Sequence, residues 1–229
     1  MKKWGSPYLL RILTVLAFAA AMGYLEAAVV VYLRALYYPE GFSFPLKLIP
    51  AGTAVIEIGR EAATIVMLLA VATLAGKQFW ERFGYFIILF GVWDIFYYVW
   101  LKVAIGWPAG MFDNDILFLI PLPWIGPVIA PVLISILMTT IGISLTRRLY
   151  MGLEFRPPVL SWMLGSAATL IILYSFFDFS GAVSKQTAPD AYNYPILIIG
   201  LILYGISYVA AVRESGRKKN NLTQCSKSQ

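Results

Sequence analysis

Six long apolar stretches, separated by short polar or proline-rich segments, constrain this chain more than any other feature of its sequence. They run approximately over residues 8–38, 51–75, 83–105, 115–146, 159–179 and 192–212. A run of about 20 apolar residues is long enough for a helix to cross the hydrocarbon core of a bilayer, which is about 30 Å thick. We therefore predict an all-α fold: a polytopic membrane helix bundle with about six transmembrane helices.

The overall composition supports a lipid environment. The chain is 60% hydrophobic and only 13% charged, whereas soluble domains average about 45–50% apolar and about 25% charged residues. A soluble fold could not cover so much apolar surface, but the lipid of a bilayer would. No segment is both polar and long enough to form an extramembrane domain. We expect one transmembrane bundle over residues 1–213 and a basic, mobile tail over residues 214–229.

The distribution of basic residues predicts the orientation. Under the predicted topology, lysines and arginines gather at the N-terminus, in the second and fourth connections and in the tail, while the other connections keep only Lys47 and Lys185. Cytoplasmic loops are enriched in basic residues, so we predict a protein integral to the plasma (inner) membrane with both termini in the cytoplasm. Because these topological residues account for the net charge of +6, we predict no nucleic-acid partner.

The residue types that are missing exclude several chemistries. The chain contains no histidine and a single cysteine, Cys225. This excludes imidazole metal ligands, histidine-ligated haem, serine–histidine triads and an intrachain disulfide. No cofactor is evident from the sequence. A divalent ion or a sodium ion held by carboxylates stays open.

The fourth apolar region is too long and too rich in proline for one straight helix. A helix over residues 115–146 would be nearly 50 Å long at about 1.5 Å per residue, and an interior proline removes a backbone donor and clashes with the preceding turn. We predict a short outer segment, a break near Pro121 to Pro127, and then a spanning helix. A re-entrant loop and a simple kinked helix are the alternatives.

Charged residues inside the predicted spans are the most informative feature for function. A charge at the centre of a bilayer costs at least about 2.5–3.5 kcal/mol, so these side chains should face one another or a wet cavity. The predicted topology places all of them between mid-membrane and the outer surface. They are Glu26, Arg34, Glu57, Arg60, Glu61, Asp94 and Lys102. In the loop just outside, Asp113 and Asp115 suit a helix N-cap, with a metal site as the alternative.

The spacing of these charges indicates a shared site. Glu57, Arg60 and Glu61 are three and four residues apart, which puts them on one helical face. Asp94 lies near the middle of the third span, with Tyr98 and Lys102 further out. The predicted substrate- or ion-binding set is Glu26, Glu57, Arg60, Glu61, Asp94, Tyr98 and Lys102. A buried salt-bridge network that only fixes helix packing is the structural alternative, and we assign neither catalytic residues nor metal ligands.

Three functions stay open from the sequence. The first is a binding or transport component for a small polar or anionic solute or an ion: Arg60 and Lys102 suit an anion, and the carboxylates suit a coupled proton or sodium ion. The second is a membrane-embedded enzyme acting on a lipid or lipid-linked phosphate at the outer leaflet. The third is an accessory subunit of a membrane complex, with another membrane protein or a second copy of the chain as partner.

Overall fold

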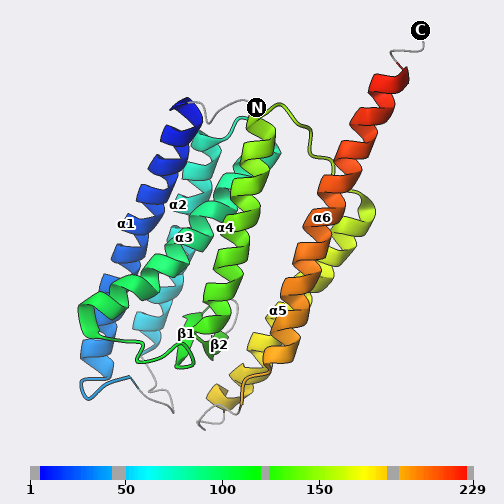
Figure 1. Cartoon of the computed structure of the whole chain (residues 1–229). Helices are drawn as coiled ribbons and strands as arrows, with labels where there is room; N and C mark the ends of the chain where they lie inside the picture. Colours follow the sequence, from blue (N-terminus) through cyan, green and yellow to red (C-terminus); the bar gives the residue numbers. More distant parts are fainter. Residues whose placement is uncertain (1–5, 43–49, 120–123, 185–190, 226–229) are drawn as a thin grey trace.

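The computed structural model describes residues 6–42, 50–119, 124–184 and 191–225, and these contain six helices and one two-stranded sheet. The first four helices lie side by side, and the last two form a separate pair next to them (Figure 1). The predicted all-α helix bundle is confirmed, with a small β-hairpin added to it.

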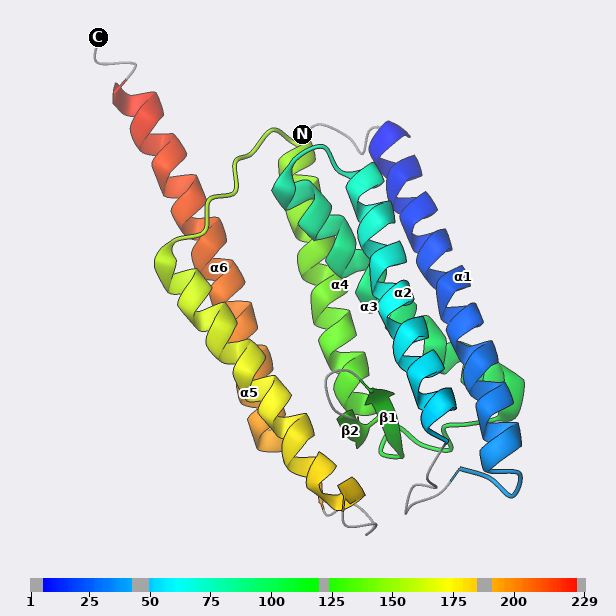
Figure 2. The same cartoon turned by 180° about the vertical axis from the view of Figure 1, so that it is seen from behind.

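The four-helix part is built around its third helix. The elements are α1 (Ser6–Tyr37), α2 (Ala51–Ala75), α3 (Phe79–Ile105) and α4 (Ile129–Tyr150). Helix α3 contacts α1, α2 and α4, and its buried aromatic and aliphatic side chains pack against apolar residues of α1 and α2. Seen from behind, α1 and α2 cover one side of α3 and α4 covers the other (Figure 2).

Helices α3 and α4 approach each other closely because glycines lie between them. A Cβ added to Gly91 would lie 2.5 Å from the carbonyl oxygen of Ser135, and one added to Gly142 would lie 2.7 Å from the carbonyl oxygen of Gly84. Small residues allow membrane helices to pack backbone against backbone. This close approach brings the polar residues of α3 within reach of those of α4.

The remaining two helices, α5 (Val159–Ser184) and α6 (Tyr194–Cys225), pack against each other along their lengths and touch the rest of the chain mainly at the hairpin and α4. Helix α6 continues past residue 212, where we expected the span to end, so residues 214–225 of the predicted tail extend the helix. The mobility of that basic tail stays a prediction.

Within the described residues, five helices are long and apolar enough to cross a membrane: α1, α3, α4, α5 and α6. The protein is therefore an integral membrane protein. Helix α2, which carries Glu57, Arg60 and Glu61, is not among the five, although it lies alongside α1 and α3 (Figure 2). A crossing by this sixth helix stays a prediction.

The segment before α4 is a β-hairpin. Its strands, β1 (Asn114–Phe118) and β2 (Trp124–Pro127), are antiparallel, with an irregularity in register between Ile116 and Phe118. We expected an outer segment followed by a helix, and α4 does begin just after this segment, at Ile129. Pro121 and Pro123, at the predicted break, lie outside the described residues. Pro131 falls in the first turn of α4, where a backbone N–H has no intrahelical acceptor.

The two ends of the molecule differ in character. Helix α1 begins and α6 ends at the same end, which we call the terminal end, while the hairpin lies at the opposite end, which we call the hairpin end (Figure 1). The terminal end also carries Lys77 in the connection between α2 and α3, Arg82 in the first turn of α3, and Arg147 and Arg148 at the end of α4. The start of α1 and the end of α6 lie at the same end, as expected for a chain that crosses between the two ends an even number of times.

Candidate functional site

The guanidinium of Arg60 joins α1 and α2 in the half of the bundle nearest the hairpin. Its Nε donates to Glu57 Oε2 at 2.7 Å, and its Nη1 donates to Glu26 Oε1. The hydroxyl oxygen of Thr64 lies 3.5 Å from Glu26 Oε2. The helical spacing of Glu57 and Arg60 thus produces one contact within α2, and the length of the arginine side chain produces the other across to α1.

A second ion pair joins α1 to the hairpin. Arg34 Nη2 donates to Asp115 Oδ1 at 3.0 Å, and both residues are buried. Arg34 also lies over the ring of Trp107, 3.7 Å from its centroid, where the electron-rich face attracts the cation. The hydroxyl of Tyr97 donates to Asp115 Oδ2 at 3.2 Å, and Tyr98 hydrogen-bonds to the same carboxylate.

Burial changes the acidity of Asp115, which lies on β1 outside the membrane-spanning helices. Removal from water raises the pKa of this carboxyl from 3.8 to about 6. The positive charge of Arg34, the N–H of Ile116 and the hydroxyls of Tyr97 and Tyr98 act in the opposite direction and limit the rise. Burial therefore makes the Asp115 carboxyl easier to protonate than an exposed aspartate.

Asp94 on α3 has a different environment from the other acids. Its Oδ2 accepts a hydrogen bond of 2.8 Å from the Ser135 hydroxyl on α4. It lies close enough to Asp115 and Glu26 to be repelled by both, so it connects the two ion-paired groups electrostatically. Although it lies deep in the bundle, Asp94 is only half-buried by surface accessibility.

Glu61 on α2 reaches the hairpin. Both of its carboxylate oxygens accept the backbone N–H of Leu119, at 3.0 Å each. Irregular backbone inside a membrane protein must find hydrogen-bond partners within the protein. Glu61 and the Arg34–Asp115 pair therefore hold β1 from two neighbouring helices.

Lys102, which we placed in the predicted binding set, contacts the end of its own helix instead. The residue is exposed, and its ammonium group donates to the carbonyl oxygens of Gly106 and Pro108, at 3.0 and 2.7 Å. It therefore caps the C-terminal end of α3, where free carbonyls and the helix dipole favour a cation. The structure brings Glu26, Glu57 and Arg60 together and sets Glu61, Asp94 and Tyr98 around them, but it leaves Lys102 outside.

Two residues outside our predicted set belong to this cluster: Arg34 and Asp115. Arg34 is visible in the sequence as a charge in the first span, but its partner lies 81 residues away in the chain. We expected Asp115 to cap a helix, but it is a buried residue of β1. The nearby Asp113 accepts hydrogen bonds from the backbone N–H groups of Ala109 and Gly110 and closes a turn. Nothing in the neighbouring sequence shows which of these two aspartates is buried in the cluster.

The resulting group, which we call the acidic cluster, contains more acidic than basic side chains among the described residues. Among the described residues it contains five carboxylates and two guanidiniums, and both guanidiniums already contact carboxylates. Its members are Glu26, Glu57, Glu61, Asp94 and Asp115 with Arg34 and Arg60. No three acidic, histidine or cysteine side chains converge closely enough to hold a metal ion in the part of the chain that the structure describes.

Comparison with known proteins adds no relative: neither a family model, nor a curated protein, nor a solved structure matches the chain. We therefore infer the function of the protein from the geometry of the acidic cluster.

Proposed function

We propose that this integral membrane protein is a transport component that binds a small monovalent cation, a proton or Na⁺, at Asp94 in the acidic cluster. The observation that carries this proposal is the environment of Asp94: among the described residues it is repelled by the carboxylates of Asp115 and Glu26, while the guanidiniums of Arg34 and Arg60 are paired with other acids. Ionised groups held inside a membrane protein without compensation are costly and usually functional.

Among the carboxylates of the acidic cluster, Asp94 has the surroundings best suited to a bound cation. It receives the Ser135 hydroxyl but contacts no guanidinium within the described residues, and Asp115 and Glu26 both repel it. A proton or a bound cation would remove this repulsion. The Asp94 residue is partly exposed, which supports access for a small ion.

The hairpin end is the side from which we propose that the ion enters. The basic connections lie at the terminal end, and the positive-inside rule would place that end in the cytoplasm. The hairpin would then face outward, covering the acidic cluster through its contacts with Glu61 and Arg34. Both termini would be cytoplasmic, as we predicted from the sequence.

The cation proposal is narrower than the functions we listed from the sequence. An anionic solute or a lipid-linked phosphate needs a free guanidinium or ammonium group. At the acidic cluster, Arg34 and Arg60 are paired with carboxylates, with only Nη1 of Arg34 left without a partner among the described residues, and Lys102 caps α3. No contact favours an accessory-subunit role over cation binding.

Cation-dependent stability of the purified protein tests this proposal. We would measure the unfolding temperature in nanodiscs at fixed ionic strength while replacing choline with Na⁺, and separately while lowering the pH. We expect one of the two cations to stabilise the protein, and Asp94→Asn to abolish that response. Ser135→Ala should weaken it, while Glu40→Gln, an exposed acid in the connection after α1, should leave it unchanged.

Two results would contradict cation binding at Asp94. If neither Na⁺ nor protons stabilise the folded protein, or if Asp94→Asn responds like the wild type, Asp94 does not bind a cation. The acidic cluster would then be a structural network that fixes helix packing and holds the hairpin.

A further inference from the structure

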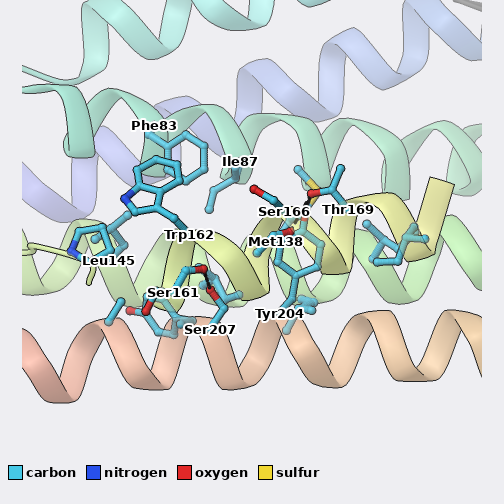
Figure 3. A pocket seen from close by; sticks show the side chains of 18 of the residues that line it. Phe83, Ile87, Met138, Leu145, Ser161, Trp162, Ser166, Thr169, Tyr204 and Ser207 are labelled. Atoms are coloured by element: carbon cyan, nitrogen blue, oxygen red, sulfur yellow. Dashed lines mark hydrogen bonds between the residues drawn. The ribbon is translucent and has the colours of Figure 1, made fainter. Parts of the chain in front are cut away.

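A long cleft separates the α5–α6 pair from α3 and α4. Its volume is about 580 Å³, and its walls are almost entirely apolar (Figure 3). The small α5 residues Gly165 and Ser166 are among its lining, and Ser166 lies near Met138 of α4 (Figure 3). The cleft is separate from the acidic cluster and contains none of its residues.

The polar groups that line the cleft mostly satisfy one another. The Ser207 hydroxyl donates to the carbonyl oxygen of Ser161 at 2.7 Å, and the Tyr208 hydroxyl donates to Ser144 Oγ at 2.8 Å. Water in an apolar cavity needs two to four polar partners, and few are available here. The surface of the cleft is therefore suited to hydrocarbon.

The shape of the cleft fits a chain better than a compact solute. Its lining on α5 extends from Ser161 to Phe176, which is about 22 Å at a rise of about 1.5 Å per residue. One leaflet of the hydrocarbon core is about 15 Å deep, half of about 30 Å. The cleft is therefore long enough to hold one whole hydrocarbon chain of a lipid lying along the helices.

Two arginines lie near the end of the cleft closest to the chain termini, although they are not among its lining residues, and two buried donors there have no hydrogen-bond partner among the described residues. Arg147 and Arg148 occupy the last turn of α4. The Nε of Arg148 is buried without a hydrogen-bond partner, and its charge acts on Tyr208, which lines the cleft. The Ser161 hydroxyl, in the cleft wall at the same end, is also buried without a partner. Leaving a buried donor unsatisfied is costly, and more so for a charged group.

We propose that the cleft binds an anionic phospholipid, with one hydrocarbon chain between α4 and the α5–α6 pair and the phosphate group at Arg148. Phosphate oxygens would accept from the Arg148 guanidinium, the Ser161 hydroxyl is a second unsatisfied donor at the same end of the cleft, and the bilayer supplies such lipids to the open side of the cleft. Anionic lipids are concentrated in the cytoplasmic leaflet, and the terminal end is the one that its basic residues would place there. The proposal does not depend on the cation site.

Native mass spectrometry of the full-length protein in a non-ionic detergent tests this site. The protein is titrated with phosphatidylglycerol and with phosphatidylcholine of the same chain length. We expect the anionic lipid to bind about tenfold more tightly, as one charge-assisted hydrogen-bond contact would give. Arg148→Gln should remove this preference, whereas Arg213→Gln, an exposed arginine on α6, should keep it.

A second pair of variants tests the chain-binding part of the cleft. Ser166→Trp places a large side chain in the cleft and should reduce binding of both lipids. Leu170→Trp changes an exposed α5 residue that does not line the cleft and should leave binding unchanged.

Four results would overturn the proposal. They are equal binding of the two lipids, an Arg148→Gln variant that keeps the preference, displacement of the lipid by soluble glycerol phosphate, and a second copy of the chain in place of lipid. Displacement by glycerol phosphate would indicate a free-phosphate site, and a dimer lost in Ser166→Trp would indicate a protein interface.

Discussion

Glu61 on α2 and Leu119, just after β1, are joined through both oxygens of the glutamate, each 3.0 Å from the Leu119 backbone nitrogen. A charged side chain of a helix thus satisfies a backbone donor of an irregular segment. The same strand is held by the ion pair of Arg34 with Asp115. Part of the charge in this membrane protein therefore anchors a hairpin that lipid could not stabilise.

Glu61→Ala should loosen the hairpin, because the Leu119 N–H would lose a charged acceptor. We expect a loss of about 1–3 kcal/mol in the free energy of unfolding and faster hydrogen exchange at the Leu119 amide. Glu61→Gln keeps one acceptor oxygen and should fall between the wild type and the alanine variant. Unchanged exchange at Leu119 in Glu61→Ala would show that Glu61 does not anchor the hairpin.

Arg60→Ala should destabilise the bundle strongly, because it leaves Glu26 and Glu57 charged, largely buried and unpaired. Removing one partner of a buried pair typically costs about 3–5 kcal/mol. Arg156→Ala is the matched control: its partner Glu154 is 70% exposed, and such pairs contribute about 0.2–1 kcal/mol. Unfolding titrations in mixed micelles would measure both losses, and losses of equal size would contradict this account of Arg60.

Asp115→Asn should change the pH dependence of stability in a defined direction. Burial raises the pKa of Asp115 from 3.8 to about 6 in the folded protein, so the fold holds this proton more tightly than the unfolded chain does. The contribution of Asp115 is therefore complete below about pH 4 and is lost as the pH rises through about 6. The charged groups that face it are Arg34 from α1 and Asp94 from α3, with the hydroxyls of Tyr97 and Tyr98.

The unfolding temperature of the Asn variant, relative to the wild type, should therefore rise between pH 4 and pH 7. Differential scanning fluorimetry across this range measures the difference directly. A variant that becomes less stable than the wild type as the pH rises would mean that the ion pair with Arg34 outweighs the cost of burying the charge.

Gly91→Ala should force α3 and α4 apart, because the added methyl group would lie 2.5 Å from the Ser135 carbonyl oxygen. Overpacking of this kind costs about 1–3 kcal/mol, and it should also disturb the hydrogen bond from Ser135 to Asp94. Gly59→Ala is the control, since a methyl group there meets nothing within 4 Å and should stabilise α2 by about 0.5–1 kcal/mol. If the two variants have the same unfolding temperature, the close contact at Gly91 does not limit the packing.

The parts of this structure that follow local rules could be predicted from the sequence. Apolar length predicts the spanning helices, and helical spacing predicts the contact between Glu57 and Arg60. The clustering of the charges nearest the hairpin follows from their depths in the predicted spans. The first two features depend on neighbouring residues in one helix, and the third depends only on the direction in which each span runs, so no knowledge of side-chain contacts between helices is needed.

The parts that depend on distant partners could not be predicted. Lys102 lies four residues after Tyr98 on α3. Its ammonium group nevertheless donates to carbonyl oxygens at the end of its own helix and not to the carboxylates of the acidic cluster that the structure describes. Asp115 becomes a site residue only because β1 folds back against α1 and α3. The strands themselves follow from backbone pairing between residues on either side of a proline-rich segment, which helical periodicity does not reveal.

Charge movement in proteoliposomes on a solid-supported membrane tests the central claim most directly. A jump in Na⁺ concentration or in pH on the side that the hairpin faces should produce a transient current in the wild type and in Glu40→Gln. The current should be absent in a folded Asp94→Asn variant. If the wild type gives no current with either cation, or if Asp94→Asn gives the same current as the wild type, the acidic cluster is not a cation site.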